Sequence, residues 1–198
     1  SKIYFENKKS FTEYRNFLIL CLYVLMPPTR IQNWILMKKK DASNMKRRGE
    51  SLTKKFNYLI KQTPGNYDVL FNNYKTASTL GSQRYSIENK TLNRLIENYL
   101  KNYAIAKSDF LFTNANARNM TQVNFTNALS SISKKILGKQ LSNNLLRRIF
   151  LTYFLNLNPS FIEKQKILNV VGQKSVMSTA DKYVIKEMNK GSYVLNFE

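Results

Sequence analysis

The sequence predicts a single α+β domain that is mostly α-helical and carries a small three-stranded antiparallel sheet in its first half. Apolar residues recur at helical spacing in several segments, as in 90–104. Two runs of strand-forming residues flank a Pro-Gly turn at 62–66. The 198 residues, 43% of them hydrophobic, suffice for one core and show no internal repeat. We therefore expect one domain over 1–198.

The first element is predicted to be a helix over 11–26. Ser10 and Glu13 have the spacing of a capping box, and the Pro-Pro pair after residue 26 ends the helix. Its apolar run is too short to span a bilayer. Residues 29–39 then predict a short helix or turn that leads into a strand.

A strongly basic stretch follows at 38–61, with nine Lys and Arg against Asp41 and Glu50. Its first part lacks a hydrophobic period. We expect a mobile basic loop over 38–55.

The predicted sheet and the later helices complete the domain. The strands are expected at 56–61, 67–74 and 82–87, with small residues and Gly81 favouring a second hairpin between the last two. An apolar tail at 192–198 is expected to pack within the chain or on a neighbouring molecule. The remaining elements are a short strand or extended segment at 110–114 and helices at 90–104, 121–137, 142–156 and 160–171.

Composition restricts the chemistry and points to a partner. The chain has 32 Lys and Arg against 12 Asp and Glu, a net charge of +20, which favours a polyanion such as double-stranded DNA and, less well, a membrane surface. It has no histidine, which excludes Ser-His-Asp and Cys-His catalysis and histidine-ligated metals. The single Cys21 lies in an apolar run and excludes disulfides. No metal, small-molecule cofactor or membrane span is expected.

Four short motifs place polar side chains where they could act on DNA. Arg30 follows the rigid bend in PPTR, and Lys75 stands at the expected hairpin tip in FNNYKT. Arg147 lies one turn into the helix that begins NNLLRR. The helix dipole disfavours a cation at this end of a helix, and a bound anion nearby would explain its presence. Lys174 precedes Tyr183 by nine residues in GQKSVMSTADKY. Taken singly, each cation could be a solvated surface charge and Tyr183 could be packing.

In this order the motifs resemble the catalytic domain of tyrosine recombinases, the phage-integrase family. The likeness is greatest to integrases of virophages, large DNA viruses and related mobile elements, in which a PP-x-R box and an FNNYKT hairpin recur. It covers about residues 10–190 and implies the tyrosine-recombinase catalytic fold. The family's N-terminal core-binding domain has no counterpart here, so we expect a fragment or a minimal enzyme. A viral protein acting inside a host cell or carried in a virion fits the likeness.

The resemblance implies a metal-independent transesterification. Tyr183 would attack a DNA phosphodiester and form a 3′-phosphotyrosine. Arg30 and Arg147 would hold the non-bridging oxygens as bidentate donors, and Lys75 would protonate the leaving 5′-oxygen.

Three positions depart from the commonest family pattern. Asn144 stands where many members carry His or Lys, Lys174 where many carry His or Trp, and Asn33 where many carry Glu or Asp. Asn144 can hydrogen-bond but cannot take a proton, and Lys174 could stabilise a phenolate or a phosphate oxygen. The general base for Tyr183 stays open between a substrate oxygen and water.

Two other functions share the basic composition. A type IB topoisomerase would use the same chemistry as a monomer, whereas a recombinase would assemble as a dimer or tetramer on DNA. A non-catalytic basic domain that binds DNA, or RNA, would form no covalent adduct. The residues expected to contact DNA outside the catalytic set are Lys38, Lys39, Lys40, Arg47, Arg48, Arg84 and Arg148.

Overall fold

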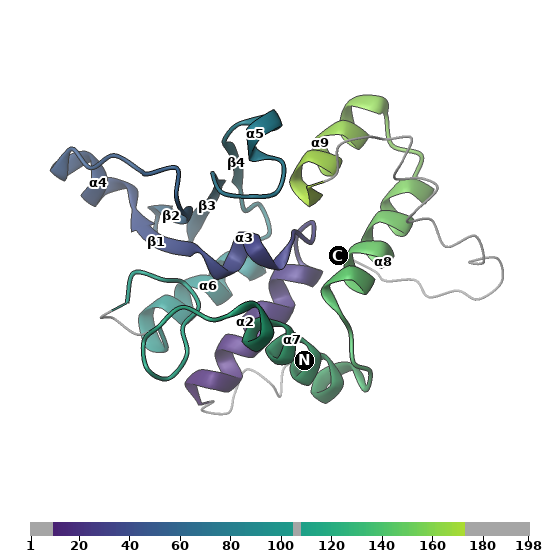
Figure 1. The fold of residues 1–198 in the computed structure, drawn as a ribbon, viewed down its shortest axis with the longest axis horizontal. Helices are drawn as coiled ribbons and strands as arrows, with labels where there is room; N and C mark the ends of the chain where they lie inside the picture. Colours follow the sequence, from purple (N-terminus) through teal and green to yellow (C-terminus); the bar gives the residue numbers. More distant parts are fainter. Residues whose placement is uncertain (1–9, 105–107, 173–198) are drawn as a thin grey trace.

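A computed structural model describes residues 10–104 and 108–172. Figure 1 shows a sheet at the upper left, a helical body below it and a pair of helices, α8 and α9, on the right. The elements in chain order are α2 (Phe11–Val24), α3 (Ile31–Ile35), β1 (Met37–Asp41), α4 (Ala42–Arg48), β2 (Asn57–Thr63), β3 (Asn66–Phe71), α5 (Ala77–Leu80), β4 (Gln83–Ser86), α6 (Lys90–Asn102), α7 (Gln122–Leu137), α8 (Asn143–Asn156) and α9 (Phe161–Val171).

The helices begin where the sequence places capping residues. Ser10 and Glu13 form the predicted capping box of α2, and Ser160 and Glu163 form a second one at α9. Ser142 caps α8 by accepting a hydrogen bond from the backbone of Leu145. Because such caps satisfy the first unpaired N–H groups of a helix, they fix these starts locally. The five long predicted helices are confirmed to within two residues at each end.

The sheet has four strands in the order β1-β2-β3-β4, so the prediction of three antiparallel strands is wrong in number. β2, β3 and β4 pair antiparallel as expected, whereas β1 pairs parallel with β2, Met37 lying opposite Asn57. A parallel pair needs a crossover between its strands, and α4 with the segment after it supplies that crossover. β1 has the sequence MKKKD, which lacks the β-branched and aromatic residues typical of strands.

The predicted loop over 38–55 is therefore also wrong in its first part, where β1 and α4 form. The backbone of 109–111 supports β1 from its other side. Lys39 N donates to Asp109 O at 2.7 Å, and Leu111 N donates to Met37 O at 2.8 Å. The segment at 110–114 is extended and makes only isolated bridges. Long-range pairing on both edges thus orders a stretch whose own sequence favours a loop.

The main core lies around α2, whose Leu18, Ile19 and Leu22 are fully buried and which packs against α6, α7 and α8. Trp34 meets Phe71 edge-on, which joins α3 to the sheet. Cys21 is buried, as expected. Within the described residues, no helix is both long and apolar enough to cross a membrane.

A smaller apolar cluster joins the two helices on the right of Figure 1. Leu151 of α8 packs there with Leu168 and Val171 of α9. This contact sets the C-terminal end of α9 beside the first turns of α8. Val171, at this end of α9, also supplies the carbonyl that Arg147 contacts.

Candidate functional site

Arg147 is one of the largest fully buried side chains in the described part of the chain, with 1% of its surface exposed. It lies in the first half of α8, and its Nη2 donates to the backbone oxygen of Val171 at 2.7 Å. The carbonyls in the last turn of a helix have no partner within the helix and carry partial negative charge. The end of α9 thus offers an acceptor to a buried cation.

Arg30 reaches the same helix end from a different part of the chain. It precedes α3 as its N-cap, and its Nη2 donates to Gly172 O at 3.4 Å. Gly172 has a φ of 76°, a conformation that favours glycine. A Cβ at this position would lie 3.5 Å from Arg30 Nε. Glycine is therefore favoured by the turn that ends α9, whereas a Cβ there would make only an ordinary van der Waals contact with the arginine.

The two arginines, 117 positions apart in the sequence, thus donate to neighbouring carbonyls. A side-chain bond ties their two segments together: Asn143 Nδ2, in the first turn of α8, donates to Thr29 O at 2.9 Å. Tyr23 is buried nearby, and burial raises the pKa of its phenol despite the opposing charge of Arg147. Tyr23 consequently stays neutral beside the arginine.

A pocket of roughly 300 Å³ opens at the N-terminal end of α8. Arg30 and Asn144 both line it, so two of the sequence-predicted site residues share one cavity. Its other polar walls come from α3 and α7. Free N–H groups at a helix start and an arginine form a suitable environment for a phosphate. The residues around the pocket are Arg30, Ile31, Gln32, Gln122, Thr126, Ser142, Asn143 and Asn144.

Gln32, Gln122 and Thr126 were not among the predicted site residues. They come from α3 and α7, which approach each other only in the folded chain. Each is an ordinary polar residue on a helix surface, and no local motif in the sequence distinguishes it from other exposed glutamines and threonines. Gln32 Nε2 donates to Gln122 Oε1 at 3.1 Å, which links the two helices across the pocket.

Lys75 lies on the connection between β3 and β4 and is exposed. The predicted simple hairpin is interrupted there by α5, which begins two residues after Lys75. Among the described residues Lys75 forms no hydrogen bond or ion pair, and none links it to either arginine. Lys174 and Tyr183 lie outside the described residues, so the expected nucleophile and its neighbour have no position here.

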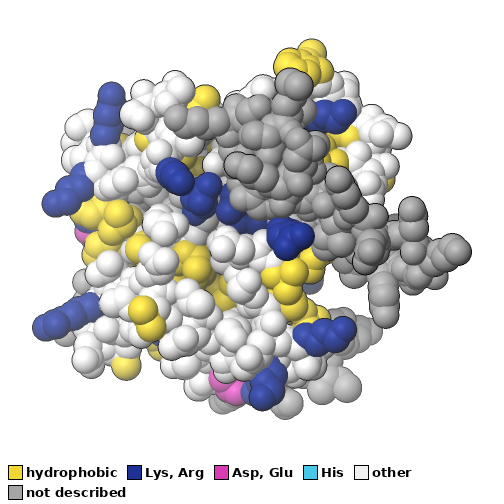
Figure 2. All heavy atoms as spheres, turned by 45° about the vertical axis from the view of Figure 1, so that its right-hand side comes forward, with side chains coloured by type: hydrophobic (Ala, Val, Ile, Leu, Met, Phe, Trp, Pro, Cys, Tyr) yellow, Lys and Arg dark blue, Asp and Glu magenta, His cyan; other side chains and the backbone are white. Residues whose placement is uncertain are grey.

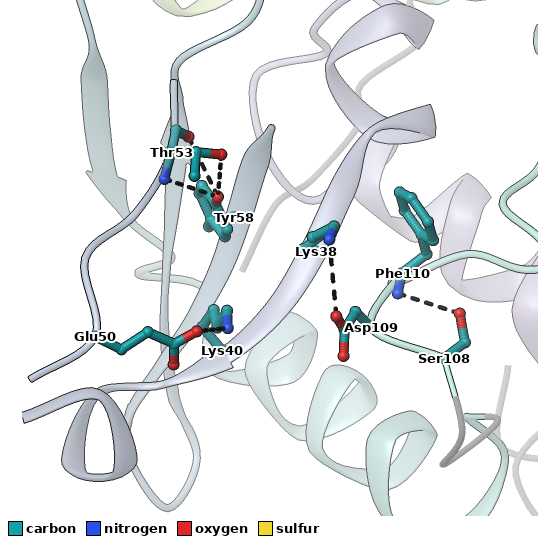
Figure 3. Close-up of polar contacts among 8 residues, drawn as sticks. All are labelled: Lys38, Lys40, Glu50, Thr53, Tyr58, Ser108, Asp109 and Phe110. Carbon is teal, nitrogen blue, oxygen red and sulfur yellow. Dashed lines mark hydrogen bonds and ion pairs between the residues drawn. The ribbon is translucent and has the colours of Figure 1, made fainter. Parts of the chain in front are cut away.

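The three consecutive lysines expected to contact DNA lie in β1 and are partly buried. Figure 3 shows Lys38 beside Asp109 and Lys40 beside Glu50. Lys38 Nζ lies 3.7 Å from Asp109 Oδ2 and 4.1 Å from the centre of the Phe56 ring. Lys40 pairs with Glu50. Burial lowers the pKa of Lys39. The side chains of Lys38 and Lys40 therefore serve contacts within the protein.

The other predicted DNA contacts are more accessible. Arg47 and Arg48 are exposed on α4, which buries no residue of its own, and Arg148 is exposed on α8. Arg84 is about half exposed and pairs with Asp68 at 2.7 Å. Figure 2 shows a group of Lys and Arg side chains near the middle of one face, with few Asp and Glu side chains there. No cluster of potential metal-binding side chains occurs in the described ranges.

Comparison with known proteins yields a likeness at the level of fold. No family model matches the sequence, and no curated protein does. Among solved structures, the crystal structure of XerA recombinase matches with a TM-score of 0.54 and 14% identity, over 85% of this chain and 52% of that chain. The chain has a recombinase-like fold. It spans about half the length of that structure, and the particular likeness to virophage-type integrases is not shown.

Proposed function

We propose that this chain is the catalytic domain of a site-specific DNA recombinase or integrase that cleaves and rejoins DNA through a 3′-phosphotyrosine. The observation that carries the proposal is the convergence of Arg30 and Arg147 on the end of α9, in a recombinase-like fold. The PPTR and FNNYKT motifs further support an integrase of the virophage and large-DNA-virus type.

In the proposed reaction the phenolic oxygen of Tyr183 bonds to phosphorus and the bond from phosphorus to the 5′-oxygen breaks. The phenol loses its proton to a substrate oxygen or water, and Lys75 donates a proton to the departing 5′-oxygen. Arg30 and Arg147 would replace the backbone carbonyls they now contact with the non-bridging phosphate oxygens. Their fork-shaped donors suit the charge that develops there. A second 5′-hydroxyl reverses the step on another strand.

The remaining predicted residues take supporting parts. Asn144 would hydrogen-bond a phosphate oxygen in the pocket it shares with Arg30. Lys174 would stabilise the phenolate or a phosphate oxygen. The partners would be double-stranded DNA and further copies of the chain, because strand exchange between two duplexes requires two or four active sites.

The test is capture of a covalent adduct on nicked duplexes of random sequence, in EDTA. In these substrates the cleaved end diffuses away and the phosphotyrosine accumulates. We expect an adduct that survives SDS with the unaltered chain, and none with Tyr183→Phe. The matched control is Tyr153→Phe, a tyrosine of α8 that is 43% exposed. It should react normally. An adduct that persists in Tyr183→Phe would refute the assignment.

Adduct capture separates the non-catalytic alternative, and an assay for relaxation of supercoiled DNA and for joining of different duplexes separates the topoisomerase. A type IB topoisomerase would also form the adduct, but it would relax supercoiled DNA as a monomer and would not join strands of different duplexes. A non-catalytic DNA-binding domain would retain the DNA without any covalent product.

A further inference from the structure

Asn57 makes the most complete side-chain hydrogen-bond network near the predicted site. It is the first residue of β2 and has no exposed surface. Its Nδ2 donates to Asn33 O and to Asn73 O, both at 2.9 Å. Its Oδ1 accepts from the backbone N–H groups of Asn72 and Asn73, both at 2.8 Å. A side-chain amide has two N–H donors and two acceptor lone pairs, so all four positions are used.

The four bonds connect two segments that carry predicted catalytic residues. Asn33 lies in the single turn of α3 that follows Arg30, and its own N–H donates to Arg30 O at 3.0 Å. Asn73 stands two residues before Lys75. The side chain of Asn57 therefore links the backbone just after Arg30 to the backbone just before Lys75.

Among the described residues, the other side-chain hydrogen bonds of Asn72 and Asn73 lead to the start of the sheet and not to α3. Asn73 Nδ2 donates to Lys55 O at 2.9 Å, and Asn72 Nδ2 donates to Phe56 O at 3.2 Å. These bonds end on the residues that lead into β2. Without the Asn57 side chain, the segment would stay attached to β2 while its direct link to α3 is lost.

We propose that Asn57 is a positioning residue that fixes Lys75 relative to Arg30. The proposal rests on the proposed function, in which Arg30 holds the phosphate and Lys75 protonates the leaving oxygen. A proton donor must lie within hydrogen-bond reach of the oxygen it protonates. A buried side chain with every donor and acceptor occupied restricts such movement, because leaving any of these groups unpaired is unfavourable.

The first measurement is amide hydrogen exchange in the full chain. Asn57→Ala removes the acceptor of the Asn72 and Asn73 N–H groups. We expect exchange at these two amides to accelerate by about tenfold or more, since an amide that loses its hydrogen bond loses its protection. The amides within β2 and β3 should be unaffected. Unchanged exchange at 72–73, or an equal increase throughout the sheet, would overturn the proposal.

The second measurement is adduct formation on two substrates. One is ordinary DNA, and the other has sulfur in place of the bridging 5′-oxygen. A thiolate leaves without protonation, so a misplaced general acid matters only for the oxygen substrate. We expect Asn57→Ala to slow adduct formation on ordinary DNA by about 10- to 100-fold, within the ~10²–10⁴-fold that a general acid contributes. On the sulfur substrate the rate should return to the unaltered level.

A second variant and a control keep the result interpretable if the alanine variant folds poorly. Asn57→Asp keeps two oxygens to accept from Asn72 and Asn73 but cannot donate to Asn33 in its charged form. Its rate of adduct formation should also return to the unaltered level on the sulfur substrate. Amide hydrogen exchange at residues 72–73 should change less than in Asn57→Ala. Asn66→Ala, at the exposed start of β3, removes an amide whose side-chain hydrogen bond among the described residues goes to Thr63 Oγ1, and it should change neither measurement.

The outcomes for the two proposals are distinct. If the unaltered chain forms adduct but the Asn57 variants are slow on both substrates, the positioning proposal fails and the proposed function stands. If the unaltered chain forms no adduct on either substrate, the proposed function fails. In that case, amide hydrogen exchange at residues 72–73 in Asn57→Ala alone tests whether Asn57 fixes the Lys75 segment.

Discussion

The arginine pair at the end of α9 and the lysines of β1 use positive charge in opposite ways. Arg30 and Arg147 are far apart in the sequence, yet their guanidinium groups donate to adjacent carbonyls. Lys38 and Lys40 are nearly adjacent in the sequence, yet each pairs with a carboxylate of its own. In a chain with a net charge of +20, neighbouring cations in the sequence can therefore be occupied by contacts within the protein.

The partners of each cation explain the difference. A lysine beside a carboxylate and over an aromatic ring has already exchanged water for protein contacts, and moving it to a phosphate would break them. Arg30 and Arg147 each donate to a backbone carbonyl, which carries only a partial charge. A phosphate offers an arginine a full charge in bidentate geometry. We infer that the carbonyl-held arginines are the better anion ligands.

The largest effects are expected from Arg147→Ala and Arg30→Ala, which should differ in stability but not in rate. Each variant should lower the rate of adduct formation by about 10²–10³-fold, as for loss of an oxyanion donor. Arg147 is fully buried and Arg30 only partly so. Arg147→Ala should therefore also lower the free energy of unfolding by about 2–4 kcal/mol, and Arg30→Ala by ~1 kcal/mol or less. Adduct kinetics and urea denaturation measure the two effects. Equal stability losses would contradict the difference in burial.

A smaller effect separates the two halves of the basic stretch. The double change Arg47→Gln and Arg48→Gln, on exposed α4, should reduce the slope of log affinity for duplex DNA against log salt by up to ~2, if each arginine contacts one phosphate. The free energy of unfolding should stay within about 0.5 kcal/mol.

The matched control is Lys38→Gln in β1. It should leave the salt slope unchanged and lower the free energy of unfolding by about 1–2 kcal/mol, because it removes the contact with Phe56 and the pair with Asp109. Salt titrations of DNA binding and urea denaturation test both variants. A reduced salt slope for Lys38→Gln would show that this lysine contacts DNA after all.

The features that the sequence predicted correctly are those that depend on residues close together in the chain. The capping box at Ser10 set the start of α2, and Ser142 capped α8 where helical periodicity began. The hairpin of β2 and β3 followed from its Pro-Gly turn. In each case the decisive contacts lie within four residues of the element.

What the sequence did not predict depends on contacts between distant segments. β1 forms because β2 on one side and residues 109–111 on the other pair with a lysine-rich segment. The pocket beside Arg30 takes Gln32 and Gln122 from helices whose approach is set by the core. The network of Asn57 ends on Asn33 and residues 72–73, and its asparagine has no local signature. Such partners follow from tertiary packing and not from local preference.

The smallest effect concerns Lys61 in β2, the last cation of the basic stretch at 38–61. Like Lys38 and Lys40, it pairs with a carboxylate of the protein. Glu97 Oε1 lies 2.8 Å from Lys61 Nζ, and the buried Tyr67 hydroxyl donates to the other carboxylate oxygen. The bond from Lys61 and that from Tyr67 lower the pKa of Glu97. A carboxyl with a lowered folded-state pKa contributes stability above its unfolded pKa of about 4.3, and this contribution is lost as the pH falls through the folded value.

Glu97→Gln should therefore cost up to ~1 kcal/mol of unfolding free energy at about pH 7, a small value because the side chain is one-third exposed. The difference from the unaltered chain should shrink towards about pH 3, where the carboxyl is protonated in both states. Urea denaturation at the two pH values measures it, and the salt slope of DNA binding should not change. A stability difference that is the same at both pH values would mean that Lys61 gains nothing from the charge of Glu97. Lys61 would then be available to a phosphate, unlike its neighbours in β1.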